Sequence, residues 1–157
     1  MSARDGDGWT ICECGGTHWG RFGAAGLLLV RTDQEVPRVL LQLRAAWTHG
    51  GGSWALPGGA LDSHEDPVEA AVREAEEEAG ILAHSVAVRH VFTDDHGNWS
   101  YHTVIAATGS DPGAHEANLE SDEVRWVEVA EVDGYALHPG LAATWPRLRT
   151  IVDDLFV

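Results

Sequence analysis

Short apolar runs separated by polar, glycine-rich stretches predict a series of strands in the first half of the chain. Residues 22–30 form an apolar run that small residues open, and residues 39–44 alternate loosely between apolar and polar positions. We expect these two strands to pair through a loop that turns near Pro37. Residues 54–56 predict a further short strand, which Pro57 ends.

The second half of the chain continues the pattern. Residues 86–93 and 101–107 predict a hairpin around the polar residues 94–98, and residues 123–129 predict another strand. All of these runs have the length of strands rather than of long helices.

Two segments have helical signals. Asp66 is a suitable N-cap and Gly80 a left-handed stop, so a helix is expected over residues 66–79. Residues 141–156 repeat apolar side chains at helical spacing and contain Pro146, which should kink this second helix or delay its start. Because strands and helices interleave, the predicted class is α/β (α+β).

Length and composition fit a single globular domain. The chain has 157 residues, of which 44% are apolar and 22% charged. We expect residues 1–20 to form an irregular N-terminal segment and residues 21–157 to form the domain. No apolar run approaches the ~18 residues of a membrane span, and the N-terminus has no apolar signal core. We therefore expect a cytoplasmic protein with no membrane partner, whose oligomeric state, a homodimer included, is left open.

Acidic residues strongly outnumber basic ones. There are 25 Asp and Glu against 10 Lys and Arg, which gives a net charge of −15, and every base is an Arg. Such a surface repels nucleic-acid polymers, whose binding needs clustered positive charge. A small anionic substrate would need a positive group to bring it in, and a divalent metal held by carboxylates is the natural candidate.

Two cysteines near the N-terminus allow two interpretations. Cys12, Cys14 and His18 could form part of a zinc site, because thiolate and imidazole are zinc ligands. However, one residue between the cysteines is a shorter spacing than zinc pairs usually show, and no fourth ligand is evident. We therefore favour two reduced cysteines in a loosely ordered segment.

Three carboxylates fall on one face of the first helix. Glu74, Glu77 and Glu78 lie within little more than one turn. The Glu74–Glu78 pair costs about 0.2–0.5 kcal/mol of helix stability through like-charge repulsion, and the dipole disfavours anions in this half of the helix. Most charge runs are solvated faces, but bound Mg²⁺ or Mn²⁺ would reverse both penalties.

The helix belongs to a longer pattern, made by Gly59, Glu65, Arg73, Glu74, Glu77, Glu78, Gly80 and Ile81. In these residues and their spacing the chain resembles the Nudix hydrolases, and Ala75 stands where that family usually has a bulkier aliphatic residue. Further similarity to actinobacterial MutT-type proteins extends the resemblance to about residues 19–149.

This resemblance implies a Nudix-type mixed sheet sandwiched between helices, and hydrolysis of a nucleoside diphosphate linked to another group. It implies Mg²⁺ or Mn²⁺ bound by Glu74, Glu77, Glu78 and the backbone of Gly59. The implied catalytic residues are Glu74, Glu77 and Glu120. For the general base, Glu74, Glu120 and the hairpin-loop residues Asp94 and Asp95 remain alternatives.

The resemblance also implies supporting and substrate-binding residues. Glu65, Arg73 and Gly80 would support the structure of this Nudix signature, which is the pattern from Gly59 to Ile81. Arg73 would orient the carboxylates through bidentate hydrogen bonds. Arg44 and His49 are candidates to touch phosphate, and His138 lies where MutT-type enzymes place a polar residue that reads the purine. The aromatic candidates to stack a base are Trp47, Trp54, Trp99 and Tyr101.

Three functions are consistent with these residues. The leading hypothesis is hydrolysis of a nucleoside triphosphate, such as 8-oxo-dGTP, to monophosphate and diphosphate. The second is a pyrophosphatase acting on ADP-ribose or a nucleotide sugar. The third is a Nudix domain that senses nucleotides without catalysis, which a missing signature carboxylate would indicate; none is missing.

Overall fold

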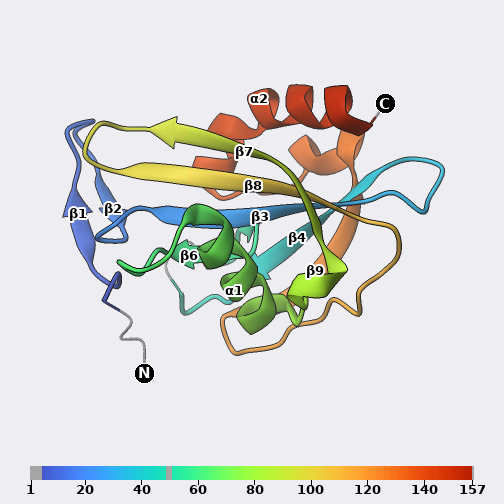
Figure 1. Ribbon diagram of the computed structural model, residues 1–157, viewed down its shortest axis with the longest axis horizontal. Helices are drawn as coiled ribbons and strands as arrows, with labels where there is room; N and C mark the ends of the chain where they lie inside the picture. Colours follow the sequence, from blue (N-terminus) through green and yellow to red (C-terminus); the bar gives the residue numbers. More distant parts are fainter. Residues whose placement is uncertain (1–4, 49–50, 157) are drawn as a thin grey trace.

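The computed structural model describes residues 5–48 and 51–156, in which a mixed sheet lies between two helices (Figure 1). The sheet strands in this part of the chain are β3 (Ala24–Arg31), β4 (Arg38–Arg44), β5 (Trp54–Ala55), β6 (Gly58–Ala60), β7 (Ala87–Asp95), β8 (Ser100–Thr108) and β9 (Ser121–Glu128). Their hydrogen-bonded order is β5-β4-β3-β8-β7, with β6 paired to β3 and β9 paired to β4. The helices are α1 (Pro67–Ala79) and α2 (Pro139–Phe156), with short 3-10 helices η1 (Ala83–Ser85) and η2 (Val129–Gly134).

The central strand β3 determines the mixed character of the sheet. It runs parallel to β8 but antiparallel to β4 and β6. The predicted pairing of residues 22–30 with residues 39–44 is confirmed, and so is the predicted hairpin, since β7 and β8 pair antiparallel. The predicted α+β class and the mixed sheet between helices are therefore confirmed.

Two apolar cores lie on opposite faces of the sheet, because successive side chains of β3 point to opposite sides. Leu28 and Val30 belong to the core beneath α2, whereas Leu27 and Leu29 belong to the core beneath α1. The fully buried apolar residues of helix α1 are all alanines, namely Ala70, Ala71, Ala75 and Ala79, and Val68 packs against the same core at the start of the helix. These alanines let α1 approach the sheet closely, which brings the carboxylates of the same helix against β4 and β6.

Both ends of α1 follow the sequence signals. The Asp66 side chain accepts a hydrogen bond from the Glu69 amide, and the Glu69 side chain accepts one from the Asp66 amide, which is a capping box. At the other end Gly80 has φ 69°, and its amide donates to carbonyls of the last turn. The predicted helix is confirmed, and its fixed ends fix the position of the acidic face.

The N-terminal segment differs from the predicted irregular chain. Strands β1 (Trp9–Ile11) and β2 (Thr17–Trp19) form a separate antiparallel hairpin, at the end of the sheet where β7 and β8 are joined (Figure 1). Trp9 lies opposite Trp19, and their rings are 5.1 Å apart in an edge-to-face arrangement. Cross-strand aromatic and β-branched pairs stabilise such ribbons. The two strands are only three residues long and are separated by a glycine-rich turn, so the sequence did not predict them.

Helix α2 begins before the predicted start at residue 141. It starts at Pro139, and Pro146 lies inside the helix, so this proline does not delay the start. Trp145, Leu148 and Val152 bury the face of α2 that packs on the sheet. No helix in the described ranges is long and apolar enough to cross a membrane.

Candidate active site

A cavity of about 640 Å³ collects residues from most elements of the fold. This volume falls in the range of small-molecule sites. Its lining includes the acids Glu74, Glu120 and Asp94, the glycines Gly58 and Gly59, the polar residues Arg44, His18, His96 and His138, and the aromatic residues Trp9, Trp19, Trp47, Trp99 and Tyr101. Acidic side chains and aromatic rings therefore line the same cavity.

A fully buried carboxylate lies on α1 beside this cavity. Glu78 is 0% exposed, and its Oε1 accepts a hydrogen bond of 2.8 Å from Nε2 of Gln42 on β4. Its Oε2 is buried without a hydrogen-bond partner among the described residues. Burial, followed by the neighbouring Glu74 carboxylate, raises the pKa of Glu78 to about 9. Without a counter-charge, Glu78 therefore holds its proton at neutral pH.

Arg73 lies at the centre of a carboxylate network at the start of the same face. Its Nε and Nη2 donate to the two oxygens of Glu65 at 2.7 and 2.8 Å. Its Nη1 donates to Glu74 at 2.7 Å and to Glu77 at 3.4 Å, and its Nη2 also donates to the Ala60 carbonyl at 3.1 Å. The hydrogen bonds from Arg73 lower the pKa of Glu65. The bidentate Arg73–Glu65 pair ties the loop before α1 to the helix.

Gly59 allows the Glu74 carboxylate to lie against β6. A Cβ atom at Gly59 would come within 2.7–2.9 Å of the carboxylate atoms of Glu74, which is closer than van der Waals contact permits. A Cβ atom at Gly58 would meet the Ala25 carbonyl oxygen at 2.5 Å and the Gly26 Cα at 2.7 Å. Gly58 is thus required by close approach of the backbone, whereas a larger residue at Gly59 would displace the Glu74 carboxylate.

The helix carboxylates do not all converge. Glu74 is 5% exposed and lies beside Glu78, whereas the Glu77 side chain is 41% exposed and contacts Arg73. Among the described residues, the three acids are not a group whose ligand oxygens all lie within 4.8 Å of one another. Like-charge repulsion and the pull of Arg73 explain why Glu77 stays on the solvent side. Only Glu74 and Glu78 are brought together as expected.

Glu120 approaches the same carboxylates from the loop before β9. Around it, the Ala117 amide donates to the Glu78 carbonyl at 3.0 Å and Ser121 Oγ donates to it at 3.4 Å. Glu120 lines the cavity together with Glu74, and its charge contributes to the raised pKa of Glu78. This position is compatible with the role expected of Glu120, which stays a prediction.

The two acids expected in the hairpin loop lie at the end of strand β7, which extends to Asp95, and they differ in position. Asp94 lines the cavity, where its Oδ2 lies 2.9 Å from Nε2 of His96. Asp95 does not line it; its Oδ1 accepts hydrogen bonds from the Gly97 amide and from Ser100 Oγ. Asp95 therefore stabilises the turn, and Asp94 is the better placed of the two alternatives.

The expected substrate-binding residues are mostly on the cavity wall. Arg44, Trp47 and His138 line it, and Trp47 is 70% exposed. His49 lies outside the described residues. Trp54 is not part of the lining, since it packs edge-to-face on Tyr135 at 5.4 Å between ring centroids. Trp99 and Tyr101 do line the cavity, as base-stacking residues must.

Sequence reasoning missed two parts of this site. Gln42 holds the buried Glu78 carboxylate, and its signal was a polar residue in the middle of an otherwise apolar strand. Trp9 and Trp19 form part of the wall, but the segment that carries them was expected to be irregular. A buried amide in a strand is a recognisable signal because buried polar groups need partners.

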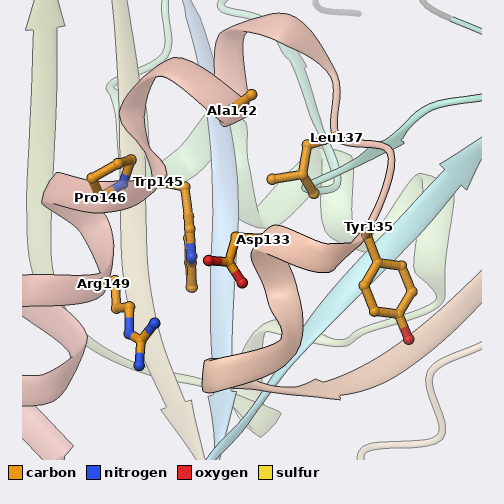
Figure 2. Close-up of a pocket in the computed structure, with 7 residues that line it drawn as sticks. All are labelled: Asp133, Tyr135, Leu137, Ala142, Trp145, Pro146 and Arg149. Carbon is orange, nitrogen blue, oxygen red and sulfur yellow. The ribbon is translucent and has the colours of Figure 1, made fainter.

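A second cavity of about 450 Å³ lies between η2 and α2 (Figure 2). Its lining residues are Asp133, Tyr135, Leu137, Ala142, Trp145, Pro146 and Arg149. None of the signature carboxylates is among them, so this cavity is separate from the candidate active site.

The donor set around Glu78 fits a hard divalent cation. Glu74 pairs with the Arg73 guanidinium at 2.7 Å, but the buried Glu78 receives only the amide of Gln42, and its Oε2 has no donor in the described chain. Carboxylate and backbone oxygens are the ligands that Mg²⁺ and Mn²⁺ prefer. Glu77 is exposed enough to turn toward such an ion at little cost.

The raised pKa of Glu78 predicts a pH effect on stability in metal-free buffer. Between its ordinary pKa of 4.5 and about 9, folded Glu78 keeps a proton that the unfolded chain releases. The free energy of unfolding should therefore decrease across this range as pH rises, relative to Glu78→Gln, which cannot titrate. Urea unfolding of both proteins at several pH values measures the difference. If the free energy of unfolding changes with pH in the same way in both proteins, the raised pKa of Glu78 is contradicted.

Comparisons with known proteins agree with this geometry. The NUDIX domain family model matches residues 20–151. A Mycobacterium tuberculosis protein named "Putative 8-oxo-dGTP diphosphatase 3" is 50% identical, over 93% of this chain and 70% of that protein. A Bifidobacterium longum "Nucleoside triphosphate pyrophosphatase/Nudix hydrolase fusion protein" is 41% identical, over 96% of this chain and 32% of that protein. The crystal structure of RenU, a Nudix hydrolase from M. smegmatis, superposes with a TM-score of 0.89 at 45% identity, over 97% of this chain and 98% of that one. The chain therefore belongs to the NUDIX domain family and is a Nudix hydrolase.

Proposed function

We propose that this protein hydrolyses a nucleoside triphosphate, with an oxidised purine nucleotide such as 8-oxo-dGTP as the favoured class, to nucleoside monophosphate and diphosphate. The observation that carries the proposal is the buried Glu74–Glu78 carboxylate pair beside a cavity that aromatic residues also line. The name of the 50% identical mycobacterial relative supports the substrate class. The proposed location is the cytoplasm, where such nucleotides occur.

The ion that this activity requires is proposed to be Mg²⁺ or Mn²⁺. Glu74, Glu77, Glu78 and the Gly59 carbonyl would hold it. When bound, it would supply neutralisation of phosphate charge and stabilisation of the leaving oxygen. With a net charge of −15, the chain needs this positive charge to accept a polyphosphate.

The chain's own residues have separate proposed tasks. Arg73 keeps the carboxylates oriented rather than touching substrate, because its donors already face Glu65, Glu74 and Glu77. Glu120 or Glu74 would accept the proton of the attacking water. Glu120 is favoured for this role, since Glu74 already accepts a hydrogen bond from Arg73.

The remaining wall would bind the nucleoside. Trp47, which is 70% exposed, offers a ring face on which a base can stack, and Arg44 offers a positive charge to the phosphates. His138 offers an imidazole to the edge of the base. Its Nδ1 accepts a hydrogen bond of 3.1 Å from the Gly140 amide, which holds the ring at the cavity wall.

Product analysis with a nucleotide panel tests this function. With Mg²⁺ present, the wild-type protein should convert 8-oxo-dGTP or another triphosphate to monophosphate and diphosphate. Preferential cleavage of ADP-ribose would instead establish the nucleotide-sugar alternative, and binding without turnover would establish a sensor.

Glu77→Gln and Glu78→Gln should each lower turnover by ~10²-fold or more, because metal binding and transition-state charge are both affected. Full activity in both variants would contradict the proposed centre.

A matched pair of loop variants tests Glu120. Glu120→Gln should lower kcat with little change in KM, because a general base acts mainly in the transition state. Glu116→Gln, in the same exposed loop, should be silent. Both residues are exposed, so unfolding free energies should stay within about ±0.5 kcal/mol of wild type. If the two variants have the same kinetics, Glu120 is not the base, and Asp94→Asn becomes the next variant to measure.

A further inference from the structure

Four potential metal ligands meet beside the N-terminal hairpin, away from the helix carboxylates. Cys12, Cys14, His18 and His96 each offer one ligand atom, and the four atoms all lie within 4.8 Å of one another. Cys14 Sγ and His18 Nε2 lie 3.2 Å apart. In a tetrahedral zinc site with bonds of about 2.0–2.3 Å, neighbouring ligand atoms are roughly 3.3–3.8 Å apart. Small side-chain adjustments would therefore close the group around one ion.

We propose that Cys12, Cys14, His18 and His96 bind one structural zinc ion. Two thiolates and two neutral imidazoles form a ligand set that favours Zn²⁺ over Mg²⁺ or Mn²⁺. Binding releases the two thiol protons and leaves a site with no net charge. The fourth ligand, His96, follows 78 positions after His18 in the chain, so the sequence alone could not reveal it.

The backbone presents the two cysteines to the same point. The Cys12 amide donates to the Gly16 carbonyl at 2.8 Å, and Gly15, with φ 94°, completes the tight turn. The Cys14 amide lies 3.3 Å from Cys12 Sγ and donates to it. An amide that donates to a sulfur stabilises the thiolate, which is the form that binds metal.

The two histidines are held by neighbouring groups. His96 Nε2 lies 2.9 Å from Asp94 Oδ2, so a proton on Nε2 donated to this carboxylate leaves Nδ1 for the metal. The His18 ring stacks on Trp99, with ring centroids 4.1 Å apart and planes 15° apart. Both ligand rings therefore have orientations that do not depend on the ion.

The site would join two hairpins that are far apart in sequence. Cys12, Cys14 and His18 come from the β1–β2 hairpin, and His96 comes from the turn between β7 and β8. Asn98 already bridges the same hairpins, because its Oδ1 accepts from the Glu13 amide at 2.8 Å and its Nδ2 donates to the Ile11 carbonyl at 2.8 Å.

The N-terminal hairpin has little apolar core of its own. The buried cluster beneath it contains Cys12, Ala24 and Trp99, while Trp9 and Ile11 are exposed. A two-stranded ribbon of this kind is marginally stable in water. A closed four-ligand metal site supplies folding free energy that so small a core lacks.

Zinc bound here would also fix one wall of the active-site cavity. His18 and His96 line the same cavity as Glu74 and Glu120. The ion itself would contact no substrate, since four protein ligands leave no open position. The proposal does not depend on the nucleotide that the protein hydrolyses.

Metal content of the purified protein tests the proposal. After dialysis without chelator, inductively coupled plasma mass spectrometry should find about one zinc per wild-type chain. Cys14→Ser and His96→Gln should lose it. Cys14 is exposed, so this variant should still fold, as circular dichroism would verify. The matched controls are His84→Gln, an exposed histidine in η1, and Glu78→Gln in the carboxylate centre; both should retain zinc.

Two further measurements separate this site from other outcomes. Co²⁺ in place of zinc should give the thiolate charge-transfer and tetrahedral d–d absorption bands, and Cys14→Ser should abolish them. Removal of zinc should increase hydrogen exchange at least tenfold in β1 and β2 while exchange in α1 stays unchanged. Any of four results would overturn the proposal. They are wild-type protein without zinc, a Cys12–Cys14 disulfide in place of the metal site, stoichiometric iron, and zinc retained by both ligand variants.

Discussion

The burial of the Glu78 carboxylate beside Glu74 is the constraint on which the rest of the site depends. An unpaired buried carboxylate is costly, and Glu78 receives one amide hydrogen bond from Gln42, while Arg73 pairs with the adjacent Glu74. The metal-free chain meets this cost by keeping a proton on Glu78, whose pKa rises to about 9. A cation would replace that proton, so the same arrangement that destabilises the charged free protein favours metal binding.

The scaffold around this pair is built to keep the carboxylates in place. Four alanines bring α1 against the sheet, and the capping box and Gly80 fix where the helix begins and ends. Arg73 connects the loop before the helix to Glu74, and Gly59 leaves room for the Glu74 side chain. Precise positioning of charged groups in this way is what lets a rigid site stabilise developing charge in a transition state.

Local signals predicted much of the fold, but pairings across the fold were less accessible. The capped helix, the β7–β8 hairpin and the β3–β4 pairing all follow from short-range patterns. The parallel β3–β8 pairing and the Gln42–Glu78 contact join distant residues that no local period connects. The direction of Glu77 depends on its contact with Arg73 and on repulsion from the neighbouring carboxylates, which spacing on a helical wheel cannot resolve. The sequence did not predict His96 as a partner of the two cysteines, because the residues come together only where the β7–β8 turn packs against the β1–β2 hairpin.

Thermal unfolding in the presence of Mg²⁺ tests the central claim most directly, because a ligand that binds only the folded chain raises its melting temperature. Increasing Mg²⁺ into the millimolar range should raise the melting temperature of the wild-type protein by several degrees. Glu116→Gln, which removes an exposed acid from the loop before β9, should respond in the same way, whereas the increase should be largely lost in Glu78→Gln. An unchanged wild-type melting curve, or an equal increase in Glu78→Gln, would show that the carboxylates of α1 do not form a metal centre.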